Sequence, residues 1–132
     1  MKIVFDTNVI ISALITHGLS YRVLDICIDK HVLFISDWII NELNETLDKK
    51  FDINQPELDR IIDFLYRSFI KIKPQGNKPT ICRDVDDNNI LFLAESVNAD
   101  IIITGDDDLL ILEKYKNIKI LTPREFIEEY EK

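Results

Sequence analysis

Residues 100–106 read DIIITGD, and this stretch indicates the fold class more clearly than any other part of the sequence. Ile101–Thr104 is a run of β-branched residues, and Gly105 and Asp106 end it abruptly. A continuous apolar run, unlike an alternating one, is typical of a parallel strand that is covered on both faces. The stretch therefore predicts a buried strand, with Asp106 just beyond its carboxyl end.

Four similar runs occur elsewhere, so that the predicted strands are 3–5, 32–35, 69–72, 101–104 and 118–121. The predicted helices are 9–15, 20–30, 37–50, 56–68, 86 or 87 to 97, 106–115, and a last one from Pro123. Strands that alternate with helices predict an α/β fold, in which a parallel sheet has helices on both faces. The length of 132 residues, with no repeat or linker, predicts one domain over 1–132.

The charge balance is unusual for a protein that binds nucleic acid. The formal net charge is −8, whereas phosphate binding normally depends on Lys and Arg. A solvated acidic surface explains such an excess, and so does a group of carboxylates facing a metal ion, which reverses the local charge. The two explanations are compatible.

The cysteines and the N-terminal segment indicate the compartment. Cys27 and Cys82 are too few for a four-thiolate zinc site, and we expect them to be reduced and buried. Asp6 and Asn8 interrupt any apolar segment of a signal peptide. No apolar run approaches the ~20 residues that span a bilayer, so a cytoplasmic protein is expected.

Three acidic residues stand where a ligand site is expected. Asp6 ends the first predicted strand, Asp106 follows the fourth, and Asp87 begins a helix. Ligands of open α/β sheets bind outside the carboxyl ends of the strands. Each residue taken alone is more simply a turn former or a helix cap, and Asp84 or Asp86 is an alternative to Asp87. The joint placement predicts a site.

Glu42 and Asp108 extend this cluster. Glu42 lies about two turns into the helix after the second strand, from which it can reach the same edge. Asp108 is a secondary candidate ligand, and Asp107 is expected to be solvated. Crowded carboxylates repel one another, and a hard divalent cation relieves that repulsion. Oxygen ligands favour Mg²⁺ or Mn²⁺, whereas zinc is disfavoured because the only histidines, His17 and His31, lack ligand spacing.

At these residues the sequence resembles the PIN-domain family, nearly from end to end. The resemblance is carried by three motifs in order, with Glu42 between the first two: IVFDTNVIISAL (3–14), RDVDDNNILFLA (83–94) and ADIIITGDDDLL (99–110). The choice of Asp87 over Asp86 rests on Ala94, which falls seven residues after Asp87, where the helix of this family usually has Ala. Relatives often have Pro at the position of Val85. The branch that this chain resembles contains toxins of toxin–antitoxin pairs.

The resemblance implies a central five-stranded parallel sheet ordered 3-2-1-4-5 in a three-layer α/β/α sandwich. It implies that an acidic quartet of Asp6, Glu42, Asp87 and Asp106 holds one or two Mg²⁺ or Mn²⁺ ions. Thr7 and Asn8 would brace Asp6, and Thr104 would line the site. It further implies metal-dependent cleavage of RNA, a small antitoxin as partner, and a homodimer.

Contacts with the substrate must come from basic residues outside the quartet. The stretch before Asp87 is loosely basic, and Lys73 and Arg83 are its main candidates for binding RNA. Scattered solvated charge explains these residues equally well.

Two other classes of function remain open from the sequence. A receiver-type phosphoacceptor domain also places acidic residues at strand ends, but it needs a Lys after the last strand, where this chain has Leu121, Thr122 and Pro123. A non-catalytic PIN-like interaction module is the second alternative, and the complete quartet argues against it.

Overall fold

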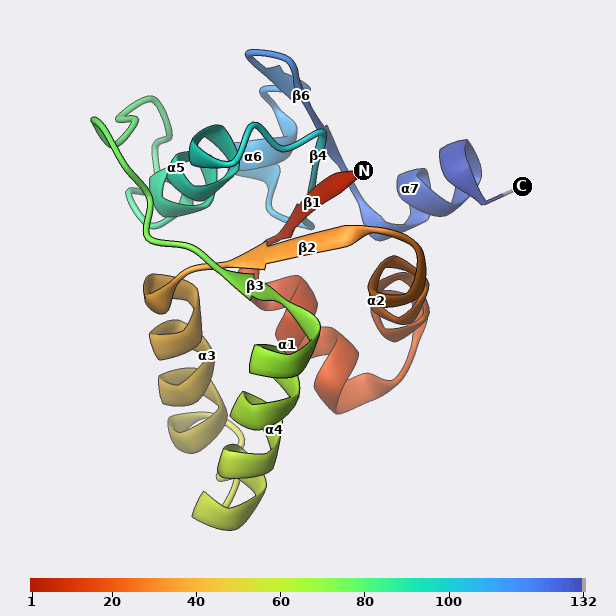
Figure 1. Ribbon diagram of the computed structural model, residues 1–132, viewed down its shortest axis with the longest axis vertical. Coiled ribbons are helices and arrows are strands. Elements are labelled where there is room, and N and C mark those ends of the chain that lie inside the picture. The colour runs from red at the N-terminus through yellow and green to blue at the C-terminus, as the bar shows by residue number, and fades with distance from the viewer. Residues whose placement is uncertain (132) are drawn as a thin grey trace.

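A six-stranded sheet forms the centre of the computed structural model, which describes residues 1–131 (Figure 1). The strands are β1 (Lys2–Phe5), β2 (Val32–Ile35), β3 (Ile70–Lys71), β4 (Ile101–Ile103), β5 (Lys114–Tyr115) and β6 (Ile118–Leu121). The helices are α1 (Thr7–Thr16), α2 (Leu19–Lys30), α3 (Asp37–Lys49), α4 (Gln55–Ser68), α5 (Asp87–Ser96), α6 (Asp107–Leu110) and α7 (Pro123–Tyr130).

The strand order is β3-β2-β1-β4-β6-β5. All neighbours pair in parallel except β5 and β6, which are antiparallel. The five parallel strands therefore have the predicted order, with the third, second, first, fourth and last predicted strands side by side. The α/β fold and its sheet order are confirmed, and β5 is a short addition at one edge.

The predicted helix over 106–115 is wrong in its second half. Helix α6 ends at Leu110, and the chain then reverses through Glu113 and Lys116, which have φ values of 59° and 54°. This reversal lets Tyr115 pair with Ile118 in the β5–β6 hairpin. Leu112 and Tyr115 pack against the core from this segment, whereas Ile111 is 79% exposed, so the segment does not bury the stripe of a continuing helix.

Strands β1 and β4 lie side by side at the middle of the sheet, and their apolar residues are buried. Ile3, Val4 and Phe5 of β1 and all of Ile101–Ile103 are at most 1% exposed. Helices α1 and α2 lie on one side of the strands and α5 lies on the other (Figure 1). Both faces of the central strands are covered, which explains their unbroken apolar sequence.

The helix starts follow the sequence signals. Ser36 accepts a hydrogen bond from the Ile39 amide at the start of α3, and Asn54 caps α4. Thr122 and Glu125 form a reciprocal capping box at α7. The caps of α3 and α7 set two of the points at which the chain leaves the sheet, after β2 and β6.

Cys27 and Cys82 are free and buried, as expected. Within residues 1–131 no single helix is long and apolar enough to cross a membrane, and only α1 and α2 taken together, bent by 107°, reach that length and composition.

Candidate metal centre

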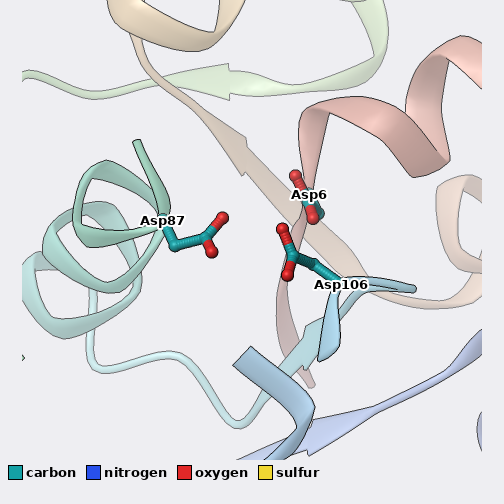
Figure 2. Close-up of side chains that lie close together, drawn as sticks. All are labelled: Asp6, Asp87 and Asp106. Carbon is teal, nitrogen blue, oxygen red and sulfur yellow. The ribbon is translucent and has the colours of Figure 1, made fainter. Parts of the chain in front are cut away.

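Three carboxylates meet at the carboxyl edge of the two central strands. Asp6 follows β1, Asp106 lies just beyond β4, and Asp87 begins α5. One oxygen of each lies within 4.8 Å of the others. Figure 2 shows the three side chains pointing toward one another from these separate segments. Because β1 and β4 are neighbours in the sheet, residues 100 positions apart in the chain become adjacent in space.

Thr104 links the carboxylate of Asp6 to the backbone of Asp106. Its hydroxyl donates to Asp6 Oδ2 at 2.6 Å and accepts from the Asp106 amide at 3.0 Å. Thr104 is fully buried, so water does not compete for these bonds. Thr104 was predicted to line the site, but it is not one of the residues that line the cavity there. Its two hydrogen bonds instead orient Asp6 and hold the backbone of Asp106.

Helix capping explains the position of Asp106 but not that of Asp6. Asp106 Oδ1 accepts from the Asp108 amide at 2.8 Å and caps α6. Asp6 occupies the same position before α1, but its side chain makes no capping hydrogen bond. Asp6 is nevertheless 5% exposed. A buried carboxylate that does not cap its own helix needs another reason for its position.

Asp87 is the acidic residue of its segment that reaches the cluster. It is 5% exposed, whereas Asp84 and Asp86 are exposed. The preceding loop is held by Asn88, whose side-chain oxygen accepts from the Cys82 amide at 3.0 Å. The side chain of Asp86 does not cap α5. This register brings Asp87, and not Asp84 or Asp86, into the group of three.

The electrostatics of the cluster are unfavourable without a cation. Burial raises the pKa of Asp87 to about 7, and the negative charges of Asp106 and Asp6 act in the same direction. Burial also raises the pKa of Asp6, against the hydrogen bond from Thr104, which lowers it. Negative charge on these carboxylates therefore lowers the stability of the folded chain when no cation is bound.

Two unsatisfied atoms indicate that these residues suit a metal ion. Thr7 Oγ1 and Asp87 Oδ2 are the buried side-chain polar atoms without a hydrogen-bond partner within residues 1–131. Both residues line one small cavity of about 100 Å³ together with Asp6 and Asp106. The cavity is small for an organic ligand. Its donors are oxygen atoms, as Mg²⁺ and Mn²⁺ prefer.

Glu42, Asn8 and Asp108 differ in their relation to this cavity, which we call the acidic pocket. Glu42 and Asn8 line it, but the Glu42 carboxylate is outside the group of three. Burial, and then the charge of Asp86, raise the pKa of Glu42. Asp108 instead binds Arg83 at 2.8 Å, and Asp107 is exposed. Thr7 and Asn8 line the pocket beside Asp6, and their predicted role in bracing Asp6 stays a prediction.

The two basic residues singled out from the sequence lie in different surroundings. Lys73 is exposed and lines a separate cavity with Trp38 and Asn89. Arg83 is engaged by Asp108, although its side chain remains 87% exposed. Their roles in binding RNA stay predictions.

Sequence reasoning missed the place of Trp38. The helical pattern of α3 predicts Trp38 as part of a buried stripe with Ile39 and Leu43. Trp38 is instead half-buried and lines the acidic pocket as well as the cavity that contains Lys73. The available signal was its position, three residues after the end of β2 and in the first turn of α3.

The raised pKa of Asp87 gives a testable pH dependence. Between pH ~4 and ~7 the folded chain holds a proton on Asp87 that the unfolded chain has lost, so unfolding releases a proton. In the presence of a chelator, the free energy of unfolding should therefore fall by about 2–3 kcal/mol between pH 5 and pH 8. Asp87→Asn should remove this fall, as measured by urea unfolding.

His31 contributes a rise in the free energy of unfolding over the same pH range, because burial lowers its pKa. The comparison must therefore be between wild type and Asp87→Asn at each pH. The exposed Asp107→Asn, which does not line the acidic pocket, serves as the control and should keep the wild-type slope. Parallel curves for wild type and Asp87→Asn would contradict the assignment.

Comparisons with known proteins agree with this geometry. The family model described as PIN domain matches residues 2–108. The uncharacterized protein MJ1680 of Methanocaldococcus jannaschii is 37% identical, over 100% of this chain and 93% of the relative.

Two solved structures share the fold. One is VapBC2 from Rickettsia felis bound to a DNA fragment from the promoter, with a TM-score of 0.66, 16% identity, and coverage of 91% of this chain and 97% of that one. The other is VapBC-1 from nontypeable Haemophilus influenzae, with a TM-score of 0.67, 17% identity, and coverage of 94% and 99%.

Proposed function

This chain belongs to the PIN-domain family, and on that premise we propose that it is a metal-dependent ribonuclease that hydrolyses phosphodiester bonds of RNA. The observation that carries the proposal is the acidic pocket. Asp6, Asp87 and Asp106 converge there, and Asp87 Oδ2 is buried without a partner. The proposed unit is a single PIN-like nuclease domain over 1–132, of which Lys132 lies outside the described residues.

Asp6, Asp87 and Asp106 would hold one or two Mg²⁺ or Mn²⁺ ions, with Glu42 as the fourth acid of the quartet and Asp108 as a secondary ligand. A bound divalent ion supplies positive charge that activates the attacking water and offsets the charge that develops on the phosphoryl oxygens. No serine or cysteine nucleophile is required.

The remaining steps depend on side chains of this chain. Thr104 keeps the Asp6 carboxylate in one orientation through its 2.6 Å hydrogen bond. Asp106 is held by the α6 amide that it caps, which leaves its second oxygen for the pocket. Glu42 is half-buried in the same pocket, and burial raises the pKa of its carboxyl above the ordinary range, so Glu42 would complete the acidic quartet at the rim of the site.

The experiment is an RNA cleavage assay with labelled single-stranded RNA, with EDTA, and with excess Mg²⁺ or Mn²⁺ added back. Cleavage should stop with EDTA and return with the metal. Asp106→Asn protein, purified in the same way, controls for contaminating ribonuclease. Cleavage that survives EDTA, or a folded protein that cleaves no RNA with either metal, would contradict the proposal and favour a non-catalytic module.

The biological setting is part of the same proposal. We propose a toxin of a toxin–antitoxin pair, acting in the cytoplasm, with a small antitoxin protein as partner and a homodimer as the assembly. The resemblance of the motifs and the fold shared with the two VapBC structures support this setting.

A further inference from the structure

A second cavity borders the acidic pocket and has different chemistry. It measures about 300 Å³ and is lined by Ser36, Asp37, Trp38, Lys73, Pro74, Asn89 and Phe92. We call it the aromatic cavity. Trp38 belongs to the lining of both, so the two cavities adjoin at this residue. The two cavities are therefore neighbours on the surface, with acidic side chains in one and aromatic side chains in the other.

The aromatic side chains of this cavity are only partly used by the fold. Trp38, in the first turn of α3, is half-buried against the core. Phe92 of α5 is also half-buried, but it is not one of the described residues that pack against the hydrophobic core. Two aromatic faces thus border a space that is large enough for a planar ring.

Polar groups suited to a nucleotide surround these faces. Asp37 is engaged by Lys71 at 3.2 Å, which offsets its charge. Lys73 makes no ion pair within residues 1–131, and its ammonium is exposed. The side-chain amide of Asn89 makes no hydrogen bond to any other described residue. The cavity therefore offers a cation for a phosphate and an amide for the edge of a base.

The other side of the acidic pocket lacks these features. A cavity of about 330 Å³ there shares Asn8 and Asp106 with the acidic pocket, and its other lining residues are Val9, Ser12, Ser20, Gly105 and Pro123. It holds neither an aromatic ring nor a basic side chain. The two flanks of the acidic pocket are thus unlike each other, and a bound strand would meet the rings on one side only.

We propose that the aromatic cavity binds one unpaired nucleobase of a single-stranded RNA whose neighbouring phosphate lies in the acidic pocket. The base stacks on Trp38 and Phe92, and Lys73 contacts the backbone. Stacking on aromatic side chains requires a base that is free of a helix, so single-stranded RNA is the substrate class. This inference rests on the proposed ribonuclease function and deepens it.

Trp38 is the single tryptophan of the chain, so its fluorescence reports on this cavity directly. The test uses the Asp106→Asn chain in Mn²⁺, which does not cleave, and titrates it with a mixed-sequence single-stranded RNA hexamer. Binding should quench the fluorescence. Phe92→Ala should weaken binding about tenfold, and Phe92→Leu, which keeps the apolar volume, should also weaken it. The exposed Tyr66→Ala on α4 should not.

The outcomes separate this inference from the proposed function. If wild type cleaves RNA but Trp38 fluorescence does not respond and Phe92→Leu binds as tightly as its parent, only the cavity assignment fails. If RNA quenches Trp38 but wild type cleaves nothing, the proposed function fails and the cavity assignment stands. A third outcome is that Trp38 fluorescence changes with protein concentration but not with RNA, and that Phe92→Ala dissociates a dimer without changing RNA binding. The aromatic cavity would then lie at an interface between two copies of the chain, and the inference would be overturned.

Discussion

Replacing Asp6 with asparagine is expected to lower the rate of RNA cleavage at least about a thousandfold and to leave the fold intact. The amide keeps the shape of the side chain and can still accept the hydrogen bond from Thr104. It removes one negative charge from the group of three, and the amide nitrogen cannot bind a cation. Cleavage is measured with labelled RNA at saturating Mn²⁺.

The same substitution should raise stability when metal is absent, by about 1 kcal/mol, because the repulsion among the carboxylates falls. Asp107→Asn is the matched control, since it removes the same charge from an exposed side chain one residue from Asp106. It should retain near wild-type cleavage. An Asp6→Asn protein that cleaves RNA at the wild-type rate would refute the assignment of Asp6.

Millimolar Mn²⁺ is expected to raise the melting temperature of the wild-type chain by about 10 °C. An ion that binds only the folded state at 100 times its Kd adds about 2.7 kcal/mol. For a chain of this size, 1 kcal/mol corresponds to a few degrees. The effect should be larger at pH 8 than at pH 5, because a proton on Asp87, whose pKa is about 7, competes with the ion. Differential scanning calorimetry measures both.

The control for this prediction is the Asp6→Asn, Asp106→Asn double variant, which keeps the fold but lacks two of the converging carboxylates. Its melting temperature should respond to Mn²⁺ no more than to Na⁺ at equal ionic strength. Equal shifts in the wild type and the double variant would place the binding elsewhere on the acidic surface.

The sheet was predictable because its central strands are buried on both faces. Ile101–Ile103 and Ile3–Phe5 have no alternating polar positions, which is typical of strands covered on both faces. The alternation of strands with helices along the chain then indicates a parallel sheet between layers of helices. The β5–β6 hairpin was not predictable in the same way. It depends on positive φ at Glu113 and Lys116, residue types that give no local signal for such a backbone.

The site was predictable in its outline because strand ends are visible in the sequence. Asp6 and Asp106 follow β1 and β4 directly, and parallel neighbours bring their carboxyl ends together. Asp87 was harder to select from three nearby acids, because the choice depends on the turn before α5 that Asn88 stabilises. Trp38 was assigned to the core because helical periodicity does not separate a buried side chain from one that lines a cavity.

The central claim is that Asp6, Asp87 and Asp106 together bind a divalent ion. The most direct measurement is anomalous diffraction from crystals of the protein grown at pH 8 with Mn²⁺. We predict a strong manganese peak in the acidic pocket, within ligand distance of an oxygen of each of these three side chains. A structure at saturating Mn²⁺ with no peak among the three carboxylates would contradict the account.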